Sequence, residues 1–362
     1  MEIPEPQSVC KMETSETIRL LKQLIAIPSF SREESGTADC IAAFLTLKGI
    51  PVNRKNNNVW AMENAGNGKP VVLLNSHHDT VKPNAGYTND PFSPIEKDGK
   101  LFGLGSNDAG AALVCMLTTF VNYYEKSDAD FSLIYAATAE EEISGKNGIE
   151  SILGDLGIID LAIVGEPTGM QAAIAEKGLL VLDCVSRGIA GHAAREEGKN
   201  AIYEALADID WFRTFQFPIQ SEMLGPVKMN VTQINAGTQH NVIPDTCTFT
   251  VDVRCTDAYS LEEILVIIDA HTSCEVIPRS TRIRPSSISP DHPVVKAAVS
   301  LGLKTYGSPT TSDQALIPFP SVKIGPGNSA RSHTADEYIY LTEIEEGNTI
   351  YTELLNALKF DA

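Results

Sequence analysis

Four short apolar runs in this sequence each lead directly into histidine or acidic side chains. The runs are Val71–Leu74, Phe131–Ala136, Leu161–Val164 and Val322–Ile324. Apolar runs of this length, separated by stretches of helical periodicity such as 109–126, are typical of buried strands in an α/β domain. The alternation of strand and helix predicts a mainly parallel central sheet. Because ligands bind beyond the carboxyl ends of strands in such sheets, we expect the side chains after these runs to meet.

The side chains in question are histidine, aspartate and glutamate. His77 and Asp79 follow the first run, Glu141 and Glu142 the second, Glu166 the third and His333 the fourth, while Asp108 stands just before the long predicted helix. Each alone has an ordinary explanation, because an aspartate before a helix is usually an N-cap and a glutamate run is usually solvated. Their order and spacing together favour a metal centre, since zinc takes nitrogen from His and oxygen from carboxylates.

Residues 179–285 show a different pattern, and we expect them to form a second domain. Strand patterns at 179–187, 227–234, 246–254 and 275–283 enclose helix patterns at 200–212 and 261–270. This β-α-β-β-α-β order indicates a ferredoxin-like α+β module. The predicted domains are therefore 1–178 and 286–362, which together form the first domain, and 179–285, which is inserted into it.

Charge and composition exclude several classes of function. The chain has 362 residues with 28 Lys and Arg against 47 Asp and Glu, a net charge of −19. Such a chain is poorly suited to nucleic acid or to anionic membrane surfaces, which attract basic residues. No apolar run reaches the roughly 18–20 residues of a membrane helix, and Met1–Glu5 does not resemble a secretory signal. Seven scattered cysteines favour free thiols, and we expect a cytoplasmic protein.

The complete motif set resembles one family. The set is His-x-Asp, Gly-x-Gly-x-x-Asp, Thr-x-x-Glu-Glu, Gly-Glu-Pro-Thr and a late Gly-Pro-Gly followed by His and Asp-Glu, between about residues 15 and 357. It resembles the two-zinc amidohydrolases, which include acetylornithine deacetylase, succinyl-diaminopimelate desuccinylase, aminoacylase and glutamate carboxypeptidase. The resemblance implies a zinc-peptidase-like catalytic domain with an inserted lid and dimerisation domain.

Carried over by position, the resemblance implies a site with two zinc ions, for which Co²⁺ or Mn²⁺ can substitute. His77 and Glu166 would bind one ion, Glu142 and His333 the other, and Asp108 would bridge both, with a cis peptide bond after it. Glu141 would be the catalytic carboxylate. Asp79 leaves an extended strand on the same face as His77 and would orient its imidazole, whereas His78 should point away.

The inserted domain carries three further candidates, again by resemblance. His192 matches a lid histidine that donates to the oxyanion, generally from the other subunit of a homodimer. Asn241 and Arg254 would hold the substrate carboxylate, because the planar guanidinium binds a carboxylate with two hydrogen bonds. The alternative for Arg254 is a structural salt bridge with an acid of the lid.

Two local features depart from the family pattern. Gly103-Leu104-Gly105 and Asp108-Ala109-Gly110 stand where relatives usually have Gly-Arg-Gly and Asp-Met-Lys-Gly. No metal ligand is lost, but the surroundings of the bridging aspartate must differ. Arg331 precedes His333, and it either reaches substrate or pairs with a nearby acid.

The sequence therefore predicts an enzyme that hydrolyses the amide of a small N-acyl amino acid. The segments at 90–105 and 325–337 are most similar to acetylornithine deacetylase and its acylcitrulline or acetyl-lysine relatives, which implies a place in arginine biosynthesis. A desuccinylase, or a dipeptidase or carboxypeptidase on the same scaffold, is the alternative. A catalytically dead binding protein is a further alternative, although every ligand and the predicted base are present.

Overall fold

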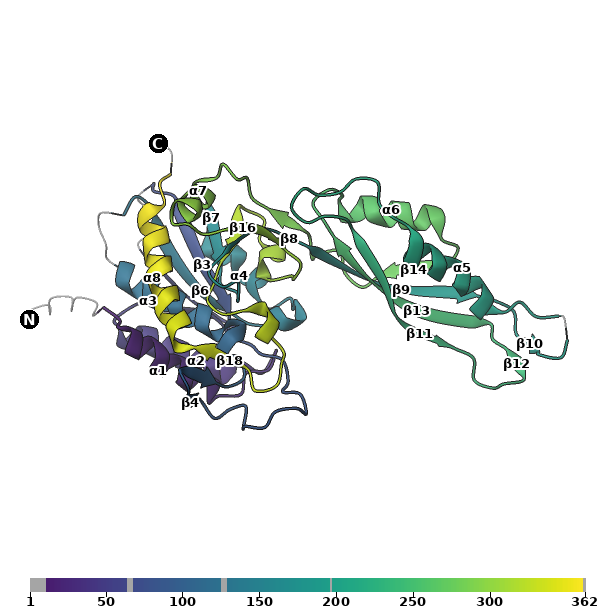
Figure 1. Cartoon of the computed structure of the whole chain (residues 1–362), viewed down its shortest axis with the longest axis horizontal. Coiled ribbons are helices and arrows are strands. Elements are labelled where there is room, and N and C mark those ends of the chain that lie inside the picture. The colour runs from purple at the N-terminus through teal and green to yellow at the C-terminus, as the bar shows by residue number, and fades with distance from the viewer. Residues whose placement is uncertain (1–10, 64–67, 125–128, 196, 361–362) are drawn as a thin grey trace, which may run out of the picture. The chain divides into compact units, whose positions relative to one another are not determined.

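The computed structural model describes residues 11–63, 68–124, 129–195 and 197–360, and the chain divides into two compact units (Figure 1). The first, here called the core unit, contains residues up to 174 together with 287–306 and 312 onward. The second, here called the inserted unit, contains 175–286 and 307–311.

Nine strands among the described residues form the sheet of the core unit, in the order β1-β2-β6-β3-β7-β17-β8-β15, with β16 also paired to β8. They are β1 (Asn53–Lys55), β2 (Asn58–Met62), β3 (Val71–His77), β6 (Ser132–Thr138), β7 (Leu161–Val164), β8 (Ala172–Glu176), β15 (Ser286–Ser287), β16 (Thr305–Ser308) and β17 (Ser321–Lys323). The four central strands β6, β3, β7 and β17 run parallel, as the sequence predicts. A smaller sheet has the order β18 (Tyr338–Tyr340), β5 (Lys100–Phe102), β4 (Ile95–Lys97).

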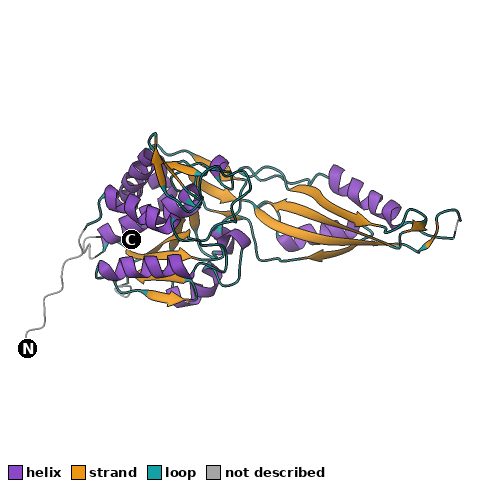
Figure 2. Ribbon diagram, turned by 90° about the horizontal axis from the view of Figure 1, so that it is seen from below, coloured by secondary structure: helices purple, strands orange, loops and turns teal. Residues whose placement is uncertain are grey.

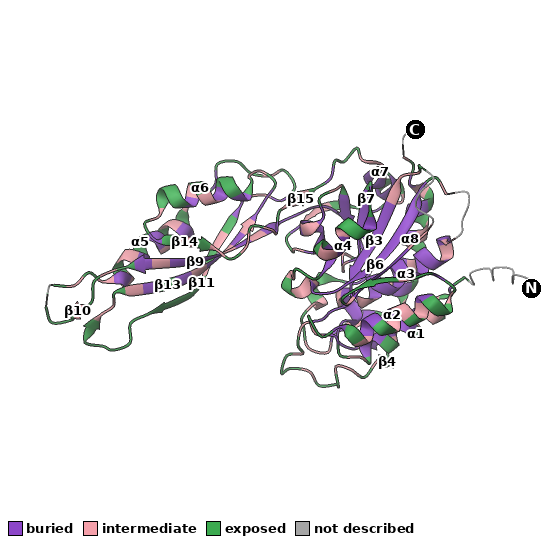
Figure 3. Ribbon diagram, turned by 180° about the vertical axis from the view of Figure 1, so that it is seen from behind, coloured by how far each residue is buried: buried purple, intermediate pink, exposed green. Residues whose placement is uncertain are grey.

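Both faces of the central strands are buried, which explains their unbroken apolar sequence. In β3, Val72 and Leu74 pack into one core cluster, while Leu73 packs into another. The second cluster also contains residues of α4 (Ile149–Leu156). The first cluster also contains residues of α1 (Thr14–Ile25), α2 (Ser35–Leu47), α3 (Ala111–Tyr123), α7 (Pro293–Ser300) and α8 (Leu341–Ala357). Figure 3 shows these helices and the buried strands between them, and Figure 2 shows the helices and strands of the chain from another side.

The inserted unit has the predicted β-α-β-β-α-β order. Its elements are β9 (Gly178–Arg187), α5 (Ala201–Thr214), β11 (Lys228–Ala236), β13 (Thr246–Cys255), α6 (Leu261–His271) and β14 (Glu275–Pro278), with a small pair formed by β10 (Gly191–His192) and β12 (Val242–Ile243). The antiparallel sheet has the order β11-β13-β9-β14. Strand β14 ends at Pro278 rather than at the predicted Ile283, and the last hydrogen bond of this pairing is that of the Arg279 N–H to Val181 O at 2.9 Å.

The boundaries between the units differ in detail from the predicted 178/179 and 285/286. The inserted unit begins at Ala175, ends at Ser286 and also includes the later segment 307–311, which the sequence assigned to the core unit. That segment is held by hydrogen bonds to the main chain of Lys177: the Lys177 N–H donates to Ser308 O at 3.2 Å, and the Thr311 hydroxyl donates to Lys177 O at 3.2 Å. These partners are more than 100 residues apart in the chain, so the sequence alone could not assign the segment.

Helix α3 begins at Ala111, two residues later than predicted, because Ser106–Gly110 forms a separate turn. The predicted end of this helix, at residue 126, lies outside the described residues, as does Cys10. The other six cysteines are free. Within the described part of the chain, every helix is too short or too polar to cross a bilayer. The cytoplasmic location stays a prediction.

Candidate metal centre and active site

The candidate ligands stand at or just beyond the carboxyl ends of the parallel strands. His77 is the last residue of β3, and Glu166 follows β7 by two residues. The helical turn Glu141–Ile143 follows β6, and the turn Ser329–Arg331, which leads to His333, lies beyond β17. Asp108 lies in the turn before α3, and its peptide bond to Ala109 is cis, as predicted. Parallel strands therefore bring together residues that are up to 256 positions apart in the chain, as the sequence predicted.

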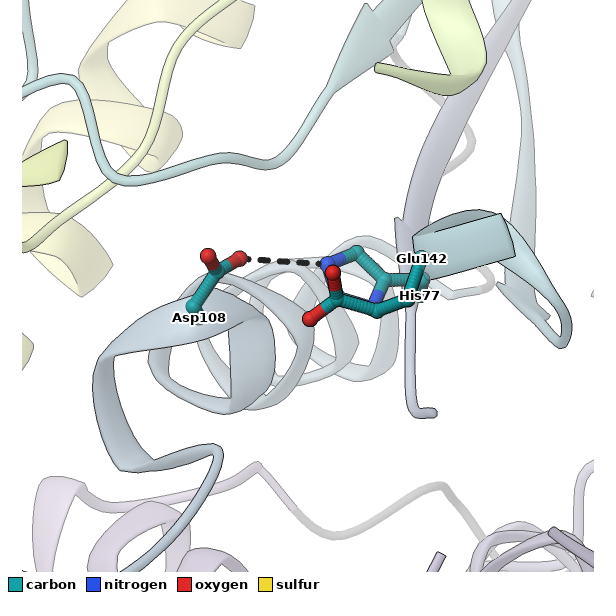
Figure 4. Close-up of side chains that lie close together, drawn as sticks. All are labelled: His77, Asp108 and Glu142. Carbon is teal, nitrogen blue, oxygen red and sulfur yellow. Dashed lines mark hydrogen bonds and ion pairs between the residues drawn. The ribbon is translucent and has the colours of Figure 1, made fainter. Parts of the chain in front are cut away.

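Asp108 lies between the two imidazoles. Its Oδ1 is 3.3 Å from His77 Nε2, and its Oδ2 is 3.7 Å from His333 Nε2. Glu166 Oε1 is 3.6 Å from His77 Nε2, and Glu142 Oε2 is 2.9 Å from His333 Nε2. Figure 4 shows His77, Asp108 and Glu142 turned toward one another. One carboxylate that presents a different oxygen to each of two histidines is the arrangement that a bridging ligand needs.

Among the residues that the structure describes, two overlapping groups of side chains have ligand atoms close enough to hold a metal ion. His77, Asp108 and Glu142 form one group and His77, Glu141 and Glu166 the other, with the atoms of each group within 4.8 Å of one another. Glu141 Oε2 is 3.9 Å from His77 Nε2. The geometry therefore brings Glu141 into the cluster, and its role as a base rather than a ligand stays a prediction.

Asp79 has more contacts than the sequence predicted. His77 Nδ1 lies 3.0 Å from the main-chain oxygen of Asp79 and 3.4 Å from its Oδ1, so the ring presents Nε2 to the cluster. The Asp79 carboxylate also accepts the main-chain N–H groups of Glu141 at 3.0 Å and Glu142 at 3.2 Å, and the Ser31 hydroxyl at 2.7 Å. One buried carboxylate therefore fixes both the imidazole and the turn that carries the two glutamates.

His78 turns away from the cluster, as predicted. Its Nδ1 lies 2.8 Å from Thr37 Oγ1, and its Nε2 lies 2.9 Å from the main-chain oxygen of Asn57. Burial lowers the pKa of His78 to about 4. Its ring is thus neutral, bonded on both nitrogens and structural.

The protonation behaviour of the cluster follows from its crowded carboxylates. Burial raises the pKa of Glu141 well above its ordinary value and that of Glu166 to about 8, although the charge of His77 opposes both shifts. Burial alone would lower the pKa of His77, but Glu141, Asp108 and Asp79 outweigh burial and raise it. The hydrogen bond to Glu142 raises the pKa of His333 to about 9. Buried carboxylates whose charged forms are disfavoured in this way can instead be neutralised by divalent cations.

Two buried carboxylates beside the cluster have no role in the sequence-based prediction. Asp313 is 3% exposed and accepts the Thr138 hydroxyl at 2.7 Å, and burial raises its pKa to about 6. Glu337 is 2% exposed, and burial raises its pKa to about 7. Glu337 stands in the quoted Asp-Glu pair, whereas nothing in the local sequence distinguishes Asp313.

Arg331 pairs with a nearby acid, which is the second of the two alternatives predicted for it. It donates two hydrogen bonds to Glu343, at 2.9 and 2.6 Å, and its guanidinium lies 5.0 Å from the centre of the Tyr338 ring. Since its side chain is 12% exposed, Arg331 is an anchor for the turn that precedes His333.

The three candidates of the inserted unit bond to other residues of that unit, and His192 and Arg254 do so only two positions away in the sequence. His192 is exposed, and its Nδ1 accepts the Ala194 N–H at 3.1 Å. The main-chain oxygen of Asn241 accepts the Ala193 N–H at 3.0 Å, so β10 and β12 bring His192 and Asn241 close together. Arg254 lies on β13 and binds Asp252 through two hydrogen bonds, at 2.9 and 3.1 Å. The salt-bridge alternative for Arg254 is therefore the contact that the structure contains.

In the core unit, histidine and acidic side chains gather at the carboxyl ends of the parallel strands, and a ferredoxin-like unit is inserted into the chain. This is the architecture of a metal-dependent hydrolase. Residues 73–357 match the profile described as Peptidase family M20/M25/M40. The chain therefore belongs to this family of metal-dependent amide hydrolases, and the predicted fold class is confirmed.

Sequence relatives carry the name of one of the predicted alternatives. A succinyl-diaminopimelate desuccinylase of Delftia acidovorans is 28% identical, over 95% of this chain and 98% of that protein. A second, of Xanthomonas campestris, is 26% identical over 95% of this chain and 99% of that protein. These names do not support the predicted specific likeness to acetylornithine deacetylase or the place in arginine biosynthesis.

Solved structures share the fold at low sequence identity. Aminopeptidase PepT of Bacillus cereus has a TM-score of 0.79 and 17% identity, over 96% of this chain and 99% of that one. The YXEP protein of Bacillus subtilis, described as a dinuclear metal binding peptidase of the M20 family, has a TM-score of 0.70 and 18% identity, over 95% and 98% of the two chains. The predicted metal cofactor agrees with the family and with the candidate site.

Proposed function

We propose that this protein hydrolyses the amide bond of an N-acyl amino acid at a site with two zinc ions. The observation that carries the proposal is Asp108, whose two oxygens face His77 and His333 while Glu141 lies beside the same cluster. Nitrogen and carboxylate donors in this number suit a two-metal catalytic site.

The side chains present fit the metal ions. His77 and Glu166 would hold one ion, Glu142 and His333 the other, and Asp108 would hold both. When bound, the ions would polarise the scissile carbonyl and lower the pKa of a water molecule. Asp79 orients His77 through the contacts described above and keeps Glu141 and Glu142 in place.

Glu141 is the proposed proton carrier. It takes a proton from water while the water oxygen forms a bond to the carbonyl carbon, and it then gives the proton to the leaving nitrogen as the amide C–N bond breaks. The products are a carboxylate and a free amine.

The inserted unit would recognise the substrate. We infer that His192 donates a hydrogen bond to the oxyanion of the partner subunit's site in a homodimer, and that Asn241 and Arg254 hold the substrate carboxylate. Arg254 must then exchange Asp252 for substrate. Its side chain is 36% exposed, and ion pairs of this kind are worth about 0–1 kcal/mol, so the exchange costs little.

The acyl group is best supported as succinyl, because the relatives that match nearly the whole chain are named desuccinylases. N-acetylornithine deacetylation is the second candidate, and the motifs at 90–105 and 325–337 support it. The two candidates share the reaction and differ only in the acyl pocket.

A substrate panel tests the proposal. Zinc-loaded protein is incubated with the N-succinyl and N-acetyl forms of diaminopimelate, ornithine and citrulline and with a dipeptide, and the released amine is measured. We expect the succinyl compounds to be cleaved faster, and Glu141→Ala to abolish release. Faster cleavage of acetyl compounds would favour deacetylation. No release from any compound by metal-loaded protein would favour the catalytically dead alternative.

A further inference from the structure

The Asp-Glu pair that ends the last motif has no part in the proposed chemistry, yet Glu337 is one of the most enclosed acids beside the site. Its side chain is 2% exposed. Its Oε1 accepts the main-chain N–H groups of Asn107 at 2.8 Å and Asp108 at 2.9 Å, and its Oε2 accepts that of Gly105 at 3.1 Å. One carboxylate thus binds three N–H groups of the turn that carries the proposed bridging ligand.

The contacts of Asn107 join the same two segments from the other side. Asn107 Oδ1 accepts the Asn328 N–H at 2.9 Å, and Asn107 Nδ2 donates to Asn328 O at 3.2 Å. Gly327 permits this approach, because a Cβ at that position would lie 2.5 Å from Asn107 Oδ1. The segment 327–337, which contains His333, is therefore bonded to the turn 105–108 at both of its ends.

Asp336 points to a different neighbour. Its Oδ1 accepts the N–H groups of Thr88 at 2.9 Å and Asn89 at 3.0 Å, which belong to an exposed loop. Asp336 and Glu337 are adjacent acids of similar chemistry, but only Glu337 contacts the Asp108 turn. Asp336 is therefore a matched control for Glu337.

We propose that Glu337 is a positioning residue that fixes Asp108 relative to His333 and so sets the affinity for the metal ion that these two residues share. The proposal rests on the proposed metal site. Groups that orient metal ligands affect affinity because the ligands must be held close to their binding geometry before the ion arrives. Glu337 orients Asp108 through the main-chain N–H groups of the turn and not through contacts with the ligand side chains.

Glu337→Gln tests the proposal with little change in volume. The amide keeps one acceptor oxygen but places an NH₂ group against an N–H donor, so at least one of the three hydrogen bonds is lost. Zinc or cobalt is titrated into metal-stripped protein by calorimetry. We expect the affinity of one of the two sites, which we assign to the ion that Asp108 and His333 share, to fall about 10–100-fold, the usual effect of removing a group that orients a ligand.

Two variants are matched controls. Asp336→Asn changes the neighbouring acid, and Asp208→Asn changes a buried acid of the inserted unit, 4% exposed, which accepts the Ser273 N–H at 2.9 Å. Both should bind metal as the unchanged protein does. If Glu337→Gln and the unchanged protein bind metal with equal affinity, the positioning role of Glu337 is refuted and the proposed metal site is not affected. Failure of the unchanged protein to bind two ions would refute the proposed metal site instead.

Two further measurements distinguish positioning from general stability. Saturating metal should restore much of the kcat of Glu337→Gln, and the metal-stripped variant should have the same far-UV circular dichroism spectrum as the unchanged protein, which an unfolded fraction would not. Hydrogen exchange is measured on the unchanged, metal-stripped protein, so this test does not depend on whether a variant folds. The amides of Gly105, Asn107 and Asp108 should be protected if Glu337 holds the turn before metal binds. Exchange of these three amides at the rate of unprotected amides would overturn the proposal.

Discussion

The candidate residues of the two units are held in opposite ways. In the core unit, His77 is 1% exposed and Asp79 0%, and both bond to other parts of the cluster. In the inserted unit, His192 and Asn241 are exposed, and Arg254 binds an acid two residues away. Except for His333, which is 54% exposed, the proposed groups of the core unit are thus largely buried in one network of contacts, whereas those of the inserted unit lie at the surface or pair with a near neighbour.

This difference has a physical basis. Metal ligands lose affinity when their geometry relaxes, so they profit from burial and from many hydrogen bonds. Groups that grip a substrate carboxylate must first release water or a neighbouring side chain, so exposed and weakly paired positions suit them. The comparison can be tested by variants that act on one unit at a time.

The largest expected effect is that of Glu141→Ala. Removal of a general base typically costs about 10²–10⁴-fold in rate, and the metal content should be retained if Glu141 is not a ligand. Amine release and atomic emission measure the two quantities. Glu345→Ala, on the exposed face of α8, is the control. A near-native rate would refute the base role, and loss of one ion would make Glu141 a ligand.

Mixed dimers test the inserted unit. His192→Ala should lose about 10²–10³-fold in kcat if the ring donates to an oxyanion. Mixing these subunits with Glu141→Ala subunits should restore measurable activity, because in a heterodimer one site would lack both residues and the other would be intact. If subunits exchange and activity does not return, His192 acts within its own chain or has no role.

Asp79→Asn should act mainly through metal binding. The amide would place an NH₂ group where the carboxylate accepts the N–H groups of Glu141 and Glu142, so both the turn and the imidazole lose their support. A loss of about 10–100-fold in metal affinity is expected, measured by titration of metal-stripped protein. Ser31→Ala removes a single hydroxyl from the same carboxylate and should have a smaller effect. Equal affinities for all three proteins would contradict the role of Asp79.

The smallest effect concerns Arg254. Asp252→Asn weakens the pair that Arg254 must leave, and a pair worth about 0–1 kcal/mol corresponds to a decrease in KM of at most about fivefold, with kcat unchanged. Asp183→Asn, which weakens the pair with Arg279 in the same sheet, is the control. An increased KM for Asp252→Asn would mean that Asp252 orients Arg254 rather than competing with substrate.

The sequence by itself determined the central strands and the set of side chains at their ends. Buried parallel strands need continuous apolar residues, so 71–74, 131–136 and 161–164 stand out, and their carboxyl ends must converge. The short exposed strands β1 and β4 lack such a pattern and were not predicted. They take their conformation from pairing with β2 and β5.

Only the tertiary structure decided which groups support the ligands. Glu337 reaches N–H groups 229–232 positions earlier in the chain, and Thr138 reaches Asp313 across 175 positions. The contacts of Arg331 with Glu343, and of the segment 307–311 with the inserted unit, likewise depend on packing. Ligand type is dictated by metal chemistry and is visible in a motif, whereas a group that fixes a main-chain turn needs only the right position in space. Many residue types and chain positions could fill that role, so it leaves little trace in the sequence.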